Sequence, residues 1–134
     1  MKELIYIGIG GFVGTAARYG VQDLIQPEEG LFPLAIWLIN MAGCFFLGWF
    51  FTVTPGKWSM GPELRLCIGT GFTGAFTTFS TFTVDVVRLA GMSELFLGLL
   101  YVVLSVAIGI IMSELGLRLG KWMLGKATRK ENTI

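Results

Sequence analysis

The sequence contains no histidine and only two cysteines among its 134 residues. Histidine is the usual acid–base group near neutral pH, and a zinc or redox centre needs clustered soft ligands. Cys44 and Cys67 lie in separate apolar stretches without such clustering, so we expect them to be packing residues. Charged residues make up only 14% of the chain. Neither an enzyme nor a nucleic-acid partner is expected from this composition.

Apolar residues make up 54% of the chain, and the mean hydropathy is +0.72, which is too apolar for a soluble domain of this size. A membrane-spanning helix needs about 20 mainly apolar residues. Four stretches meet this requirement, at residues 4–25, 34–53, 66–89 and 95–119. The connections between them are short. The sequence therefore predicts an all-α membrane protein, with a single four-span domain over residues 1–134 and a basic tail at 120–134.

Positive charge is unevenly distributed between the two sides of this arrangement. The side that carries both termini has eight basic residues: Lys2, Lys57, Arg65, Arg118, Lys121, Lys126, Arg129 and Lys130. The other side has Arg18 and Arg88, with acidic residues at Asp23, Glu28, Glu29 and Glu94. The positive-inside rule predicts that both termini are cytoplasmic. The tail is expected to be solvated, with contact to anionic lipid headgroups as the alternative.

The third apolar stretch contains an unusual segment at residues 71–82, which reads Gly-Phe-Thr-Gly-Ala-Phe-Thr-Thr-Phe-Ser-Thr-Phe. Two glycines and five hydroxyl residues among four phenylalanines predict a break in the third helix near the bilayer midplane. Such a break is stable only inside protein or beside water, and broken helices are where ion sites are commonly built. Phe76, Phe79 and Phe82 recur at intervals of three, and their ring edges carry partial positive charge. The segment is a candidate anion site.

Polar residues in two other stretches support this interpretation. Asn40 offers amide donors in the second stretch, and Tyr101, Ser105 and Ser113 share one face of the fourth, with Gly109 in the missing place. Each has a plainer explanation, because phenylalanines pack, hydroxyls bond to their own helix, and asparagine joins helices. Their joint occurrence beside a broken helix favours an ion path.

Glycine pairs at Gly10 and Gly14 and at Gly116 and Gly120 allow helix backbones to approach closely. Packing within the chain is the favoured explanation for each pair, and packing against a second subunit is the alternative. Four helices of this size enclose little space alone, so an oligomer is expected.

The segment at 71–82 resembles the signature of the small Fluc (CrcB-type) fluoride channels, G-F-x-G-x-x-T-T-F-S-T-F. Residues 14–19 (Gly-Thr-Ala-Ala-Arg-Tyr) are similar to the family's first-span arginine motif, and residues 39–43 (Ile-Asn-Met-Ala-Gly) to its second-span motif. The resemblance extends over essentially the whole chain. It implies passive export of cytoplasmic fluoride through the plasma membrane of a prokaryote, by an antiparallel (inverted) dimer with two narrow pores.

The resemblance also implies residue roles. Phe79 and Phe82 match the pore phenylalanines, and Asn40 the polar donor that faces them. Tyr101, Ser105 and Ser113 match a hydroxyl track, and Arg18 a vestibule arginine. Gly74 and Thr77 match residues whose backbone carbonyls bind a structural, untransported sodium ion at the dimer centre. Asp85 occupies a position where related chains are acidic, and it receives no role.

Two departures from the family pattern concern the pore, because Ile36 replaces an expected threonine and Gly109 a hydroxyl residue. The charge asymmetry also favours insertion in one orientation only. We therefore expect an oppositely oriented paralogue as the partner, with a homodimer as the alternative. A single-pore or non-conducting partner subunit is another possibility. A small multidrug-resistance-type exporter is less favoured, because it would need a carboxylate deep in the first span.

Overall fold

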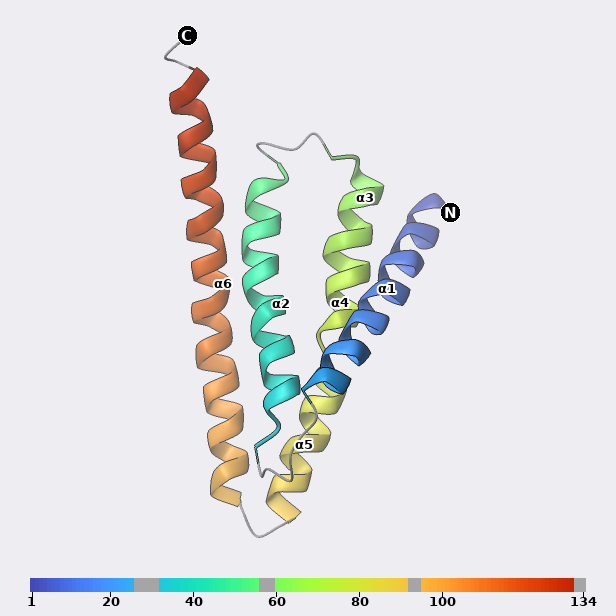
Figure 1. Ribbon diagram of the computed structural model, residues 1–134, viewed down its shortest axis with the longest axis vertical. Coiled ribbons are helices and arrows are strands. Elements are labelled where there is room, and N and C mark those ends of the chain that lie inside the picture. The colour runs from blue at the N-terminus through green and yellow to red at the C-terminus, as the bar shows by residue number, and fades with distance from the viewer. Residues whose placement is uncertain (26–31, 56–59, 92–94, 132–134) are drawn as a thin grey trace.

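Two long helices share the most extensive contact in the computed structural model, which describes residues 1–25, 32–55, 60–91 and 95–131 (Figure 1). These helices, α2 (Leu34–Val53) and α6 (Leu95–Glu131), run side by side in the same direction. The remaining elements are α1 (Lys2–Leu24), α3 (Pro62–Leu66), a π-helix (Cys67–Phe72), α4 (Thr73–Phe76) and α5 (Phe79–Gly91). Both termini lie toward the end of the bundle where α2 is connected to α3.

The described residues contain helices and no strand, so the prediction of an all-α protein is confirmed. Three of the described helices are long and apolar enough to cross a membrane: α1, α2 and the part of α6 at Leu95–Lys126. The first stretch was predicted at 4–25, within one or two residues of α1, and the second has the bounds predicted. The third stretch, 66–89, is divided among α3, the π-helix, α4 and α5, so the four-span count stays a prediction.

Glycines set the closest helix contacts, as the sequence predicted, and these contacts lie within the chain. A Cβ atom on Gly10 or Gly14 would collide with backbone atoms of Cys67 and Phe72 in the π-helix. On α6, a Cβ on Gly116 would meet the Phe45 carbonyl oxygen of α2. Packing within the chain, the favoured explanation for both pairs, is confirmed.

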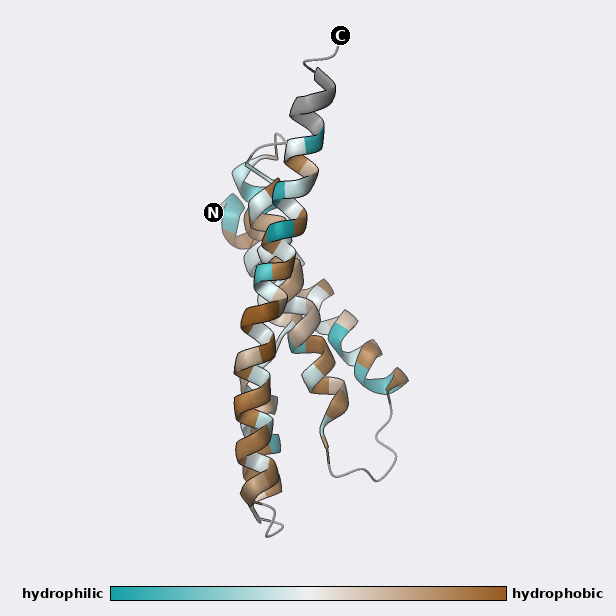
Figure 2. Cartoon of the chain, turned by 90° about the vertical axis from the view of Figure 1, so that its left-hand side faces the viewer, coloured by the Kyte–Doolittle hydropathy of each residue, from teal (hydrophilic) through white to brown (hydrophobic). Residues whose placement is uncertain are grey.

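Large apolar side chains cover much of the outer surface. The exposed fractions are 78% for Phe12, 80% for Phe79 and 78% for Phe96. Figure 2 shows the same apolar character along most of the lower part of α6. Such a surface requires lipid or a protein partner, as expected for a membrane protein.

The segment predicted as a tail at 120–134 continues α6 as far as Glu131, so the helix is longer than the stretch at 95–119. Lysine, methionine, leucine and alanine favour helix, and the Lys126 ammonium lies 3.9 Å from the ring centroid of Trp122, one turn earlier. Residues 132–134 lie outside the described residues, as do Lys57, Glu28, Glu29 and Glu94, which entered the charge argument.

Candidate functional site

The third apolar stretch is interrupted between α4 and α5. Helix α4 ends at Phe76, and Thr77 is extended, with φ −74° and ψ 156°. Thr78 then caps α5, because its Oγ1 accepts a hydrogen bond from the N–H of Thr81 at 3.2 Å. A threonine oxygen that accepts from the third helical N–H is a typical helix N-cap. The interruption therefore follows from a local sequence signal, the threonine that precedes Phe79.

Asn40 of α2 holds this interruption through both ends of its side-chain amide. The N–H of Thr78 donates to Asn40 Oδ1 at 2.9 Å, and Asn40 Nδ2 donates to the Thr78 carbonyl at 3.1 Å. Thr78 is only 6% exposed, so both of its backbone groups depend on protein partners. One Nδ2 hydrogen is left for another acceptor. Asn40 therefore acts as a brace: its two hydrogen bonds stabilise the backbone at the interruption.

These bonds release two backbone carbonyls. In a continuous α-helix, the N–H groups of Thr78 and Thr81 would bond to the carbonyls of Gly74 and Thr77. Here they donate to Asn40 and to the Thr78 hydroxyl instead. Gly74 is exposed, and nothing lies within 4 Å of the position of a Cβ on it. Two carbonyl oxygens therefore lose their usual helical donors, and one of them belongs to the exposed Gly74. Oxygen is the donor atom that hard cations prefer.

The predicted phenylalanines lie just beyond the interruption and differ in environment. The ring centroid of Phe82 lies 5.0 Å from that of Tyr101 and 5.9 Å from that of Phe79. Tyr101 is completely buried, and its hydroxyl has no hydrogen-bond partner within the described part of the chain. Phe79, by contrast, projects outward with 80% of its surface exposed. The structure brings Phe82 to Tyr101 and leaves Phe79 facing out of the subunit.

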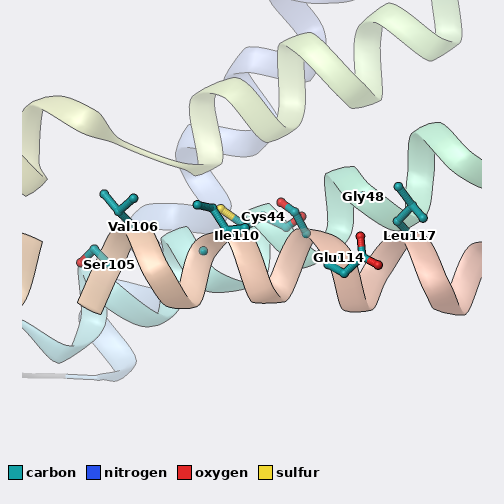
Figure 3. Close-up of a pocket in the computed structure, with 9 residues that line it drawn as sticks. Cys44, Gly48, Ser105, Val106, Ile110, Glu114 and Leu117 are labelled. Carbon is teal, nitrogen blue, oxygen red and sulfur yellow. The ribbon is translucent and has the colours of Figure 1, made fainter. Parts of the chain in front are cut away.

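A groove of about 510 Å³ follows the contact between α2 and α6 (Figure 3). Ser105, Gly109 and Ser113 line it from α6, and Cys44 and Gly48 line it from α2. The Ser113 hydroxyl donates to the Cys44 carbonyl at 3.2 Å, whereas Ser105 Oγ is buried without a partner among the described residues. Two serines and the Glu114 carboxylate are therefore the polar side chains of a groove whose other lining is mainly apolar.

Arg18 stands apart from this groove. It lies on α1, about one turn beyond Gly14, which touches Phe72 at the end of the π-helix. Within the described residues α1 packs on α3, the π-helix, α4 and α2, but makes no contact with α6. The Arg18 side chain is half-buried, and the helix that carries it packs on elements of the third stretch and not on the helix of the hydroxyl row.

Sequence reasoning missed two residues of this region. Thr78 is hydrogen-bonded by Asn40 and caps α5. The available signal was its position three residues before Thr81, which is the spacing of a helix N-cap. Cys44 was expected only to pack, yet it lines the groove. Its position depends on the rotation of α2 against α6, for which the sequence offers no signal.

The sequence has relatives among known proteins. The family described as "CrcB-like protein, Camphor Resistance (CrcB)" matches residues 5–117. A Moorella thermoacetica protein named "Fluoride-specific ion channel FluC 1" is 43% identical over 118 residues, covering 87% of this chain and 84% of the relative. A Bacillus thuringiensis protein of the same name is 46% identical over 129 residues, covering 94% of each chain. An Oceanobacillus iheyensis protein named "Fluoride-specific ion channel FluC" is 36% identical over 119 residues, covering 89% and 92%.

The relatives are named as ion channels and not as enzymes, in agreement with the expectation from composition. The match includes the signature at 71–82 and both shorter motifs, since it extends over residues 5–117. This chain belongs to the CrcB family, the family of the fluoride-specific ion channels.

Proposed function

We propose that this chain is a subunit of a fluoride-selective passive channel that exports cytoplasmic fluoride. The observation that carries the proposal is the helix interruption that Asn40 holds through two hydrogen bonds to Thr78. Phe79 follows it directly, and the Phe82 ring centroid lies 5.0 Å from that of Tyr101. The names of the relatives support fluoride as the transported ion.

A small anion that enters a narrow apolar path must exchange its hydration for other donors. The hydroxyls of Tyr101 and Ser105, which have no hydrogen-bond partner in the part of the chain that the structure describes, are suited to this exchange, and Ser113 continues the row. The rings of Phe79 and Phe82 add edges with partial positive charge. Arg18, placed near the broken segment, raises the local anion concentration. These groups bind fluoride weakly and in sequence, as electrodiffusion requires.

The released carbonyls of Gly74 and Thr77 fit the proposed structural sodium site. A bound sodium ion would supply fixed positive charge close to the anion path. Two carbonyls are too few for a sodium ion, so a second interruption from a partner must contribute the others. The open surface at Gly74 leaves room for such an approach.

The functional unit is an antiparallel dimer that buries the outward-facing Phe79, with this chain in the plasma membrane of a prokaryote and both termini in the cytoplasm. A homodimer requires insertion in both orientations, which the charge asymmetry opposes. An oppositely oriented paralogue is therefore the favoured partner. In such a pair the departures at Ile36 and Gly109 would make the two pores unequal.

The experiment is fluoride efflux from liposomes that contain this chain, alone and co-expressed with a paralogue, with chloride as the control anion. Selective fluoride flux in either preparation supports the channel. Absence of flux from both folded preparations would overturn the proposal.

A non-conducting scaffold subunit is the alternative, in which the aromatics only pack. Phe82→Ala separates the two, since a channel subunit should lose flux with its assembly intact and a scaffold should lose assembly. Phe96→Ala, on an exposed apolar surface of α6, is the matched control.

A further inference from the structure

The hydroxyl row on α6 has a gap at Gly109. Tyr101, Ser105 and Ser113 recur at four-residue intervals or their multiples, and Gly109 occupies the intervening place without a side chain. The space above it is filled from α2, because a Cβ on Gly109 would lie 3.4 Å from Cys44 Sγ and 3.7 Å from the terminal methyl of Met41. The Cys44 thiol therefore lies in van der Waals contact with the place that a side chain at position 109 would take.

We infer that Cys44 completes this row as an anion-contacting residue, and that its thiol is a site at which a small thiol reagent blocks fluoride passage. The inference rests on the proposed channel function and deepens it. It assigns the place left by Gly109 to a side chain from the neighbouring helix. The S–H group is a donor like the hydroxyl it replaces, though a weaker one.

Two contacts between α2 and α6 hold the thiol at this place. The Ser113 hydroxyl donates to the Cys44 carbonyl at 3.2 Å, and the backbone of Ser113 lies against Gly48, one turn after Cys44. These contacts fix the rotation of α2 against α6. In Figure 3 the sulfur points from α2 toward α6 near Ile110.

The rest of the groove suits an anion in spite of one carboxylate. Glu114 also lines it, but its Oε1 lies 2.8 Å from Arg118 Nε, so its charge is compensated. The Ser105 hydroxyl, on the other side of the gap, has no partner among the described residues. An anion at Gly109 would therefore meet Ser105 and the Cys44 thiol together.

Methyl methanethiosulfonate is a suitable probe because it adds only a thiomethyl group. The Cys44 thiolate attacks the methylthio sulfur, the S–S bond of the reagent breaks, and methanesulfinate leaves, while the thiol proton passes to the buffer. The product is a methyl disulfide that extends into the groove and removes the S–H donor.

The first test follows the extent of this reaction by mass spectrometry in the reconstituted full chain, with Cys67 as the internal control. We expect Cys44 to react faster than Cys67, and fluoride to slow the reaction at Cys44 relative to equimolar chloride. Equal rates at the two thiols, or no effect of fluoride, would overturn the inference. This readout does not require flux, so it is independent of the channel assay.

The second test measures fluoride efflux in the preparation that conducts. The reagent should block the Cys67→Ser protein as it blocks the wild type, and should leave Cys44→Ser conducting. Cys44→Ala should reduce flux on the order of fivefold, since it removes a hydrogen bond to an ion. Adding Gly109→Ser to Cys44→Ala should restore flux, because the new hydroxyl enters the space that the sulfur vacates.

The double variant distinguishes an anion contact from simple packing. If Cys44→Ala conducts normally, or if Gly109→Ser fails to restore flux in a correctly folded Cys44→Ala protein, the inference is wrong while the channel function stands. If the wild type and all variants are silent with every partner, the channel function itself fails.

Discussion

Replacing Asn40 with alanine tests the central feature of the site. The substitution removes both hydrogen bonds to Thr78, at 2.9 Å and 3.1 Å, and leaves the N–H and carbonyl of that residue without partners. Thr78 is 6% exposed, so water cannot readily replace the amide. The break between α4 and α5 then loses the side chain that ties it to α2.

The expected loss of stability follows from these two groups. A buried donor or acceptor left unsatisfied costs about 1–3 kcal/mol. Partial relaxation and the exposure that remains reduce the sum for two groups, so we expect the free energy of unfolding to fall by about 2–5 kcal/mol. Asn40→Asp should keep one of the two hydrogen bonds, because its carboxylate still accepts from the Thr78 N–H but offers no donor to the Thr78 carbonyl.

Unfolding in detergent micelles, followed by circular dichroism at fixed protein concentration, provides the measurement. Ser113→Ala is the matched control, because it removes one bond to the Cys44 carbonyl, which lies within α2. The control should lose no more than about 1 kcal/mol. An Asn40→Ala protein as stable as this control would refute the assignment of Asn40 as a brace, whatever its effect on flux.

Other substitutions test the packing, the helix cap and the field around the site. Gly116→Val should destabilise the chain by about 1–3 kcal/mol, because the new side chain would meet the Phe45 carbonyl. Gly125→Val is the control and should have little packing effect, because nothing lies within 4 Å of a Cβ at that position. Thermal unfolding in detergent compares the two variants. Thr78→Val should cost about 1 kcal/mol through the lost cap of α5, and Thr78→Ser should retain it; equal destabilisation in the same assay would contradict this assignment. Arg18→Gln should lower fluoride efflux most at low ionic strength, and a reduction that is the same at about 0.01 M and 1 M salt would argue against long-range attraction.

Much of the helical framework could be predicted from hydropathy alone. The bounds of α2 match the predicted stretch at 34–53, and those of α1 differ by one or two residues, because a run of about 20 apolar residues has few alternatives to a helix in lipid. The end of α6 was less predictable. Past Leu119 the sequence becomes polar, but its residues still favour helix, so hydropathy and helix propensity indicate different ends.

The interruption between α4 and α5 lies within the segment of glycines and hydroxyl residues at 71–82, and Thr78 shows which part of it depends on local sequence. Its side chain caps α5 by accepting a hydrogen bond from a residue only three positions later, so the start of this helix depends on neighbouring residues in the sequence. The partner of its backbone is 38 residues away. No local pattern indicates that the amide of Asn40 satisfies Thr78.

The sequence by itself determined that this protein is a helical membrane protein of the CrcB family, because apolar length and a long motif are properties of the linear chain. Only the tertiary structure decided that Asn40 braces Thr78 and that the Cys44 thiol lies over Gly109. Both contacts depend on how α2 is rotated and shifted against its neighbours. That rotation is set by many close contacts at once, such as Gly48 against Ser113 and Gly116 against Phe45, which come from packing in three dimensions and not from spacing along the chain.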